Sequence, residues 1–234
     1  MLALVGGDEF KPGNQDQDRL LVDRRGAGPA YVLATAAARQ GPERAVATAT
    51  QWFGSLGLAL RELPVLRRSD ASSPSNVELA EQGGFFYLTG GDPGLVVDVL
   101  RESLVWQAIA AAWSAGAALA GSSAGAMAFG EWTLVRKTYP GQAQRRYKPA
   151  LGLIPGVAVA PHFETFGHRW VEPALADLPV EDVTIVGIDE RSAVVWDGER
   201  WTARGPGNTT VITRRGRTVH PSGEPVHLPA PNRL

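Results

Sequence analysis

Residues 121–125, with the sequence GSSAG, match the G-x-S-x-G pattern that places a serine between two glycines. The pattern follows an apolar segment typical of a strand and precedes small residues typical of a helix start. Small neighbours allow the sharp turn that exposes the central hydroxyl, and the helix N-terminus adds free amide donors. Ser123 is therefore our candidate nucleophile, and Ser122 fits the pattern less well. A serine-rich turn without chemistry is the alternative interpretation.

A nucleophilic serine needs a base, and the chain contains four histidines. His162 lies in VAVAPHFETF at the end of an apolar strand, from which its side chain can enter a cleft. His168 lies in a polar loop, whereas His220 and His227 lie in a proline-rich tail. We expect His162 to act as the base, and a purely structural histidine is the alternative.

A carboxylate that orients the imidazole is harder to assign. Glu164 follows His162 by two residues, so on an extended strand both side chains face the same side. Glu131, on the expected helix after Ser123, is the second candidate, although a solvated carboxylate explains it equally well. A hydroxyl or an amide could also orient the imidazole, because this role does not strictly need a charge. We favour Glu164.

A second glycine-rich strand end, FYLTGGD at residues 86–92, offers a place for an oxyanion. The carboxyl ends of parallel strands gather at one edge of a sheet, so we expect this segment near Ser123. The amides of Gly91 and Ala124 are our expected oxyanion donors. The alternative is a turn into a helix capped by Asp92, and the two interpretations are compatible.

Strand-like and helix-like segments alternate through the first half of the chain. Expected strands cover residues 2–6, 31–37, 62–66, 85–90 and 117–121. Expected helices cover residues 42–60, 74–83 with Ser75 as its cap, and 93–115 with a break near Glu102. This alternation predicts a parallel sheet with helices on both faces.

The second half of the chain is richer in strands. Expected strands cover residues 157–163, 184–189, 193–198, 200–205 and 210–219. Asp197 and Gly198 form a typical hairpin turn between two of them. We therefore predict one α/β domain over residues 1–234, with a mainly parallel central sheet and a β-rich C-terminal part.

Composition narrows the possible classes of function. The 234 residues are 44% hydrophobic and 20% charged, as in ordinary globular proteins. The 23 basic and 24 acidic residues nearly balance, so the chain has no overall positive charge that would attract nucleic acid. No apolar run approaches the ~18 residues of a membrane-spanning helix, and the missing secretory signal pattern favours the cytoplasm. Cysteine is absent, the histidines are dispersed and no phosphate-binding loop is present, so we expect no metal and no cofactor.

Five segments carry a family resemblance: LALVGG, FFYLTGGD, GSSAGAM, APHF and VGIDERSAVV, spanning residues 2–195. Their order and spacing resemble the peptidase E and cyanophycinase family of serine peptidases, which share a fold with class I glutamine amidotransferases. The resemblance implies a three-layer α/β sandwich, often dimeric, with Ser123 as nucleophile and His162 as base. It also implies an oxyanion hole from Gly91 and Ala124. The predicted function is a serine peptidase that hydrolyses short peptides as an exopeptidase.

The sequence departs from this family in three places. Pro93 follows Asp92 where cyanophycinases commonly carry Gln, and Arg169 is the single arginine in a stretch where they carry several. Neither cyanophycin nor an Asp-X dipeptide is therefore the expected substrate. Residues 138–141, where relatives carry the third triad residue, contain no carboxylate. The His-x-Glu spacing of class I amidotransferases supports Glu164 by resemblance.

The expected substrate cleft is bordered by Asp92 and Arg169, and it should suit short peptides. Arg169 could pair with a substrate carboxylate, although a surface role suits it equally well.

Two functions from other classes also fit the sequence. An α/β-hydrolase esterase would use Ser123, then Asp189 or Asp197, then His220. A non-catalytic binding protein would keep the fold without a triad, and the missing loop carboxylate is its best support.

Overall fold

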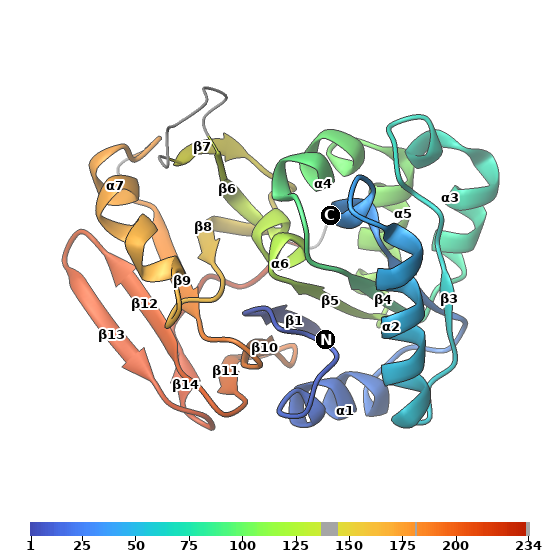
Figure 1. Ribbon diagram of the computed structural model, residues 1–234, viewed down its shortest axis with the longest axis horizontal. Helices are drawn as coiled ribbons and strands as arrows, with labels where there is room; N and C mark the ends of the chain where they lie inside the picture. Colours follow the sequence, from blue (N-terminus) through green and yellow to red (C-terminus); the bar gives the residue numbers. More distant parts are fainter. Residues whose placement is uncertain (137–144, 181, 233–234) are drawn as a thin grey trace.

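The computed structural model describes residues 1–136, 145–180 and 182–232, which form two β-sheets and the helices around them (Figure 1). The larger sheet has eight strands in the spatial order β14-β11-β10-β1-β5-β4-β2-β3. Its strands are β1 (Leu2–Val5), β2 (Ala30–Leu33), β3 (Leu60–Glu62), β4 (Phe85–Leu88), β5 (Ala118–Ser122), β10 (Ala193–Trp196), β11 (Trp201–Arg204) and β14 (Pro225–Val226).

The parallel part of the larger sheet comprises β1, β5, β4, β2 and β3. On the other side of β1 the sheet continues with β10, β11 and β14, each antiparallel to its neighbour. The predicted α/β fold is thus confirmed, and the predicted parallel sheet is confirmed for its first five strands. The C-terminal strands extend this sheet as well as covering it.

The smaller sheet has six strands in the order β13-β12-β9-β8-β6-β7 and lies at the left of Figure 1. Its strands are β6 (Gly130–Arg136), β7 (Arg145–Pro149), β8 (Ile154–Ala160), β9 (Thr184–Ile188), β12 (Thr209–Thr213) and β13 (Gly216–His220). The pairs β6–β8 and β8–β9 are parallel, whereas the other three pairs are antiparallel. The carboxyl ends of β8 and β9 therefore lie side by side.

Helices cover both faces of the larger sheet, as the alternation of segments predicts. The helices are α1 (Gln15–Asp23), α2 (Pro42–Ser55), α3 (Pro74–Glu81), α4 (Pro93–Leu100), α5 (Leu104–Ser114), α6 (Ala124–Phe129) and α7 (Val171–Ala176), of which α7 packs against β7 of the smaller sheet. Along β1, Ala3 and Val5 pack in one core with α1 and α2, while Leu2 and Leu4 point into the core on the opposite face. That second core also contains α3 to α6 and residues of the smaller sheet. Among the described residues, no helix has the length and apolar character needed to cross a membrane.

Local signals in the sequence set several element ends. The break near Glu102 is confirmed, because Glu102 has φ 57° and the Ser103 side chain accepts from Trp106 N to begin α5. The hairpin at Asp197 and Gly198 is confirmed by the antiparallel pairing of β10 with β11. Other element ends differ from those that the sequence predicts.

The predicted strand 62–66 begins and ends earlier, at Leu60–Glu62, because Pro64 has no N–H to continue the ladder. The predicted single strand 210–219 is a hairpin of β12 and β13. Helix α3 starts at Pro74, which places Ser73 rather than Ser75 at its N-cap position.

A buried carboxyl group lies between α1 and α2 in the first of these cores. Asp18 is fully buried, and its Oδ2 accepts a hydrogen bond from Trp52 Nε1 at 2.7 Å. Burial raises the pKa of Asp18 to about 7, with a further increase from the charge of Glu9 and an opposing effect of the Trp52 hydrogen bond. The acid is therefore largely protonated in the folded protein below neutral pH.

We expect the Asp18→Asn variant to gain stability relative to the wild type as the pH rises. Between pH 5 and 8 the unfolded carboxyl is ionised while the folded one keeps its proton up to about pH 7, so wild-type stability falls. An Asn can accept the Trp52 hydrogen bond without this penalty. Urea unfolding should show the difference between variant and wild type growing by roughly 2 to 3 kcal/mol from pH 5 to pH 8. A difference that does not change with pH would contradict the buried acid.

Candidate active site

Ser123 occupies the turn between β5 and α6, with φ 48° and ψ −108°. This conformation is strained for a residue with a side chain and is typical of a sharp strand-to-helix elbow. Packing requires the neighbouring glycines: a Cβ at Gly125 would lie 2.4 Å from the carbonyl oxygen of Leu88, and one at Gly121 would lie 2.5 Å from the Gly125 carbonyl carbon. Ser123 is partly exposed, whereas Ser122 is buried. Of the two serines, Ser123 is the one that a substrate can reach.

His162 lies just beyond the end of β8 and reaches the hydroxyl of this serine. Its Nε2 is 3.1 Å from Ser123 Oγ. The backbone N–H of His162 donates to Gly6 O at 2.6 Å, and the imidazole lies so close to Gly7 that a Cβ there would be 2.3 Å from Cε1. The ring of Phe166 stacks on the imidazole, with centroids 4.9 Å apart and planes 20° apart. The imidazole is thus held by close contacts with Gly7 and Phe166.

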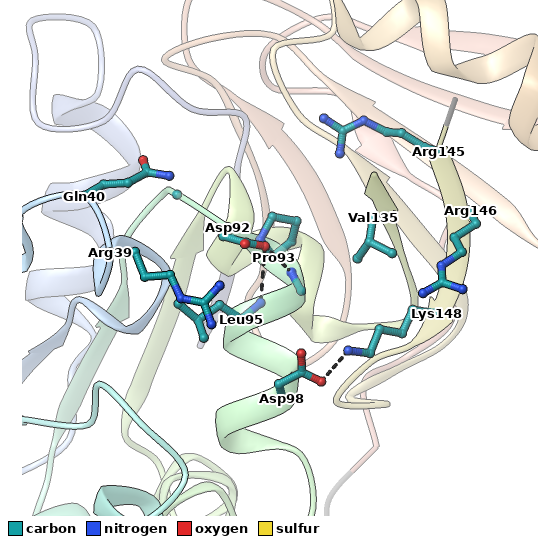
Figure 2. Close-up of a pocket in the computed structure, with 12 residues that line it drawn as sticks. Arg39, Gln40, Asp92, Pro93, Leu95, Asp98, Val135, Arg145, Arg146 and Lys148 are labelled. Carbon is teal, nitrogen blue, oxygen red and sulfur yellow. Dashed lines mark hydrogen bonds and ion pairs between the residues drawn. The ribbon is translucent and has the colours of Figure 1, made fainter. Parts of the chain in front are cut away.

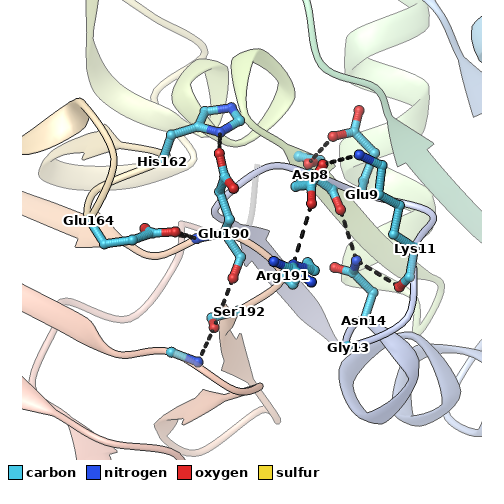
Figure 3. Close-up of polar contacts among 12 residues, drawn as sticks. Asp8, Glu9, Lys11, Gly13, Asn14, His162, Glu164, Glu190, Arg191 and Ser192 are labelled. Atoms are coloured by element: carbon cyan, nitrogen blue, oxygen red, sulfur yellow. Dashed lines mark hydrogen bonds and ion pairs between the residues drawn. The ribbon is translucent and has the colours of Figure 1, made fainter.

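Glu190 supplies the carboxylate on the other ring nitrogen (Figure 3). Its Oε1 is 2.7 Å from His162 Nδ1, and the two side chains are only 23% and 20% exposed. Because a carboxylate accepts, it holds the imidazole proton on Nδ1 and leaves Nε2 free to accept from Ser123 Oγ–H. The next residue, Arg191, donates its N–H to Gly7 O at 2.9 Å. The arrangement gives the imidazole the tautomer that a general base needs.

The two expected oxyanion donors, the N–H groups of Gly91 and Ala124, have no acceptor among the described residues. Gly90 is close enough to Ser123 that a Cβ built on it would be 3.4 Å from the serine Cβ. The N–H of Gly90 donates to Glu9 Oε1 at 2.9 Å, so this amide is occupied. The N–H of Gly91 follows it, and the N–H of Ala124 opens α6, where no intrahelical acceptor exists. These two N–H groups therefore stay candidates for oxyanion donors.

Comparison with known families gives this geometry its context. The family model of peptidase family S51 matches residues 1–204. The chain belongs to peptidase family S51. This family is one of serine peptidases, so the chain is a peptidase hydrolase, and the family resemblance predicted from the sequence is confirmed.

Solved structures of S51-like peptidases resemble the chain over most of its length. A peptidase from an acI-B1 Actinobacterium is 30% identical, with a TM-score of 0.83 over 96% of this chain and 95% of that one. A putative peptidase E protein from Listeria monocytogenes EGD-e is 18% identical, with a TM-score of 0.64 over 88% of this chain and 98% of that one, and this likeness concerns the fold alone. No curated protein matches the sequence.

In this S51 peptidase the two carboxylates expected to orient the imidazole have other partners. Both oxygens of Glu164 accept from the backbone N–H of Glu190 at 3.0 Å, so Glu164 holds the loop that carries Glu190. The strand ends at Ala160, and the chain then turns, so the alternation expected to place Glu164 beside His162 does not apply. Glu131 Oε2 accepts from Gly156 N at 2.7 Å. The expected contact of Glu164 with the imidazole is therefore corrected: the carboxylate in contact with His162 is that of Glu190.

Sequence reasoning missed Glu190, although a usable signal was present. Strands β8 and β9 are parallel neighbours, with Ala160 opposite Gly187 at the end of their ladder. His162 follows one strand and Glu190 follows the other, so their side chains meet at the same sheet edge. The same rule places the loop after β4 near Ser123, where a Cβ built on Gly90 would lie 3.4 Å from the serine Cβ.

Burial raises the pKa of Glu164, and the nearby charge of Asp189 adds to this effect. The hydrogen bonds from the backbone act in the opposite direction. Protonation of Glu164 weakens an acceptor that the Glu190 loop uses.

A cavity of about 460 Å³ is lined by Gly91, but not by Ser123 or His162, and it is rich in charged side chains (Figure 2). Its charged lining residues are Arg39, Arg145, Arg146, Lys148, Asp92 and Asp98. Lys148 is paired with Asp98, and the Arg145 guanidinium lies 3.6 Å from the centroid of the Trp170 ring. Cations outnumber anions around this space, which suits an anionic group.

Of the two residues expected to border the substrate, only Asp92 lines this cavity. Its Oδ1 also caps α4, accepting from Gly94 N at 2.9 Å and Leu95 N at 3.3 Å, so the interpretation of this segment as a turn into a helix capped by Asp92 is confirmed. Arg169 is exposed in the short helix η3 (Gly167–Trp170) and is not among the cavity residues. Residues 138–141 lie outside the described residues.

The α/β-hydrolase alternative depends on His220. This residue ends β13, an outer strand of the smaller sheet, whereas the imidazole at Ser123 is that of His162. Together with the S51 match, this position excludes the esterase interpretation.

We predict that Gly125→Ala lowers stability by about 2 kcal/mol or more, because the new methyl group would meet the Leu88 carbonyl in a packed elbow. Gly54→Ala is the matched control: it lies in α2 with open space around it and should be neutral or stabilising by up to about 1 kcal/mol. Urea unfolding of both variants measures the difference. Equal stability of Gly125→Ala and wild type would contradict the tight elbow.

Proposed function

We propose that this S51 peptidase hydrolyses short peptides with Ser123 as nucleophile, His162 as general base and acid, and Glu190 as the residue that orients the imidazole. The observation that carries the proposal is the continuous chain of contacts, 3.1 Å from Ser123 Oγ to His162 Nε2 and 2.7 Å from Nδ1 to Glu190 Oε1. Both distances lie within hydrogen-bond reach, as proton transfer from Ser123 to His162 and orientation of the imidazole by Glu190 require.

The first half of the reaction forms an acyl-enzyme. Ser123 Oγ attacks the peptide carbonyl carbon while His162 Nε2 takes its proton, and Glu190 stabilises the resulting imidazolium. The carbonyl oxygen becomes an oxyanion that the amides of Gly91 and Ala124 receive, each contributing on the order of 3 kcal/mol. His162 then gives its proton to the leaving amine, and the C–N bond breaks.

Water completes the cycle by the same groups. His162 removes a proton from water, the resulting hydroxide attacks the acyl carbon, and the second oxyanion uses the same two amides. Its collapse breaks the ester bond, Ser123 regains its proton from His162, and the carboxylate product leaves.

The cavity supports short substrates and exopeptidase action. Its volume of about 460 Å³ corresponds to a small ligand, within the ~300–1,000 Å³ of small-molecule sites. Arg39 and Arg146 at its border favour a free carboxylate, which a short peptide carries near its scissile bond and an internal segment of a protein lacks.

We expect Ser123→Ala and His162→Ala each to lower kcat by about 10⁴-fold or more, because the two groups act as a unit. A fluorophosphonate probe followed by peptide mass mapping should label wild-type Ser123 and fail to label the His162→Ala variant. Wild-type turnover in Ser123→Ala would overturn the whole mechanism.

Three isosteric variants separate the roles of the carboxylates. Glu190→Gln should lower kcat by roughly 10³- to 10⁴-fold, because an amide can hold the wrong tautomer and leaves the imidazolium uncompensated. Glu164→Gln should cost less than about 10-fold, since its carbonyl oxygen still accepts from the Glu190 N–H. Glu131→Gln is the matched control and should leave kcat unchanged, because it also keeps an acceptor for Gly156. A loss in Glu164→Gln that exceeds the loss in Glu190→Gln would reverse our assignment.

Exopeptidase action is tested with a mixed peptide library analysed by mass. We expect cleavage near a terminus of short peptides, and slower cleavage of the same peptides when the C-terminus is amidated, because the amide removes the carboxylate that the basic cavity favours. A folded protein should stay intact. If internal bonds of long peptides are cleaved as fast as bonds near the termini of short peptides, the exopeptidase mode is refuted. The proposed triad would not be affected by this result.

A further inference from the structure

Glu9 is a carboxylate beside the nucleophile that the mechanism above does not use. It lies in the loop after β1, and β1 pairs in parallel with β5 so that Val5 stands opposite Ser122. Glu9 Oε1 accepts from Gly90 N at 2.9 Å, and Glu9 Oε2 accepts from Ser122 Oγ at 2.9 Å. One side chain therefore joins the loop after β4 to the end of β5.

The two groups that Glu9 holds stand directly before the proposed reacting groups. Gly90 precedes Gly91, the first oxyanion donor, and Ser122 precedes Ser123 and Ala124. The two loops come from different strands and have to agree in position to within a few tenths of an ångström for two donors to meet one oxygen.

The loop around Glu9 is itself firmly held. The residues on both sides of it have positive φ, 55° at Asp8 and 61° at Phe10, and the Phe10 ring packs 5.1 Å from that of Tyr87. The Asn14 side chain donates to Asp8 O at 3.0 Å, and the Asp8 carboxylate pairs with Arg191 at 3.3 Å (Figure 3). Glu9 is thus presented in one fixed position.

The charge of Glu9 gives no benefit to the proposed transition state. A carboxylate behind the Gly90 amide opposes the developing oxyanion, because like charges at short range repel. It also opposes ionisation of the buried Asp18, whose pKa it raises. The useful property of Glu9 is its pair of acceptor oxygens rather than its charge.

We infer that Glu9 is a positioning residue that ties the two halves of the oxyanion hole together through Gly90 N–H and Ser122 Oγ–H. By occupying the Gly90 amide, it also leaves the Gly91 amide as the donor that faces the substrate. This inference rests on the proposed function of Ser123.

Two substitutions of Glu9 distinguish the effect of its two hydrogen bonds from the effect of its charge. In Glu9→Gln the carbonyl oxygen still accepts from Gly90 N–H, and the amide can donate to Ser122, whose hydroxyl rotates to accept. In Glu9→Ala both groups lose their partner. Lys11→Ala is the matched control, because Lys11 is an exposed ion-pair partner of Asp8 in the same loop.

The test measures kcat and KM on a peptide and the rate at which a fluorophosphonate labels Ser123, all in the full chain. We expect Glu9→Ala to lower kcat and the labelling rate by about 10²-fold with KM changed by less than about threefold, the size expected for one misplaced donor. Glu9→Gln should stay within about threefold of wild type, and Lys11→Ala should match it. Wild-type kcat in Glu9→Ala, or a Glu9→Gln variant as slow as Glu9→Ala, would overturn the inference.

A folding control keeps the test decisive. If Glu9→Ala does not fold, Ser122→Ala removes one of the two ties, and it should lower kcat by about 10-fold when Glu9 is present. An unchanged kcat in Ser122→Ala then overturns the inference. If wild-type Ser123 is neither labelled nor active, the proposed function itself has failed; if it is labelled and the Glu9 variants equal it, only the role of Glu9 has failed.

Discussion

Three successive carbonyl groups at the end of β1 hold the three segments that make up the candidate site. The carbonyl of Val5 accepts from Ser123 N at 3.0 Å, and the next two carbonyls along the chain accept from His162 N at 2.6 Å and Arg191 N at 2.9 Å. Consecutive Cα atoms are about 3.8 Å apart, so these acceptors impose a short, fixed spacing on their donors. Segments far apart in the sequence are thereby brought together, and Glu190 comes with its neighbour Arg191.

The same strand end explains how the site tolerates strain. Ser123, His162 and Arg191 have φ values of 48°, 49° and 58°, each of which costs on the order of 1 to 3 kcal/mol in a residue with a side chain. These residues lie in turns, so the interactions that offset their strain come from the surrounding structure. Strand β1 is buried along its whole length between β5 and β10, and this packing keeps its last carbonyls in place. The strained turns are thus maintained by the core of the larger sheet.

This dependence decides which parts of the site the sequence can reveal. Ser123 is predictable because the elbow is a local pattern in which packing demands glycine on both sides, and the helix break at Glu102 is a local signal as well. Glu190 is not local: its contact with His162 exists because β8 and β9 happen to be parallel neighbours. Strand alternation would place Glu164 beside His162 only if β8 continued beyond Ala160, where it ends. Apolar periodicity marks strands but does not say which strands pair. It therefore does not reveal that six of the strands form a separate sheet.

Three carboxylates surround the site, and their partners separate their roles in the proposed mechanism. Glu9 and Glu164 accept from neutral donors of loops that follow strand ends, where backbone N–H groups have left the ladder and need acceptors. For Glu164, burial and the nearby charge of Asp189 raise the pKa, so its ionisation has a cost. Glu190 alone among the three faces a group that becomes cationic when His162 takes the proton of Ser123. Its charge is compensated more strongly in the transition state than in the resting enzyme, and only such differential stabilisation accelerates a reaction.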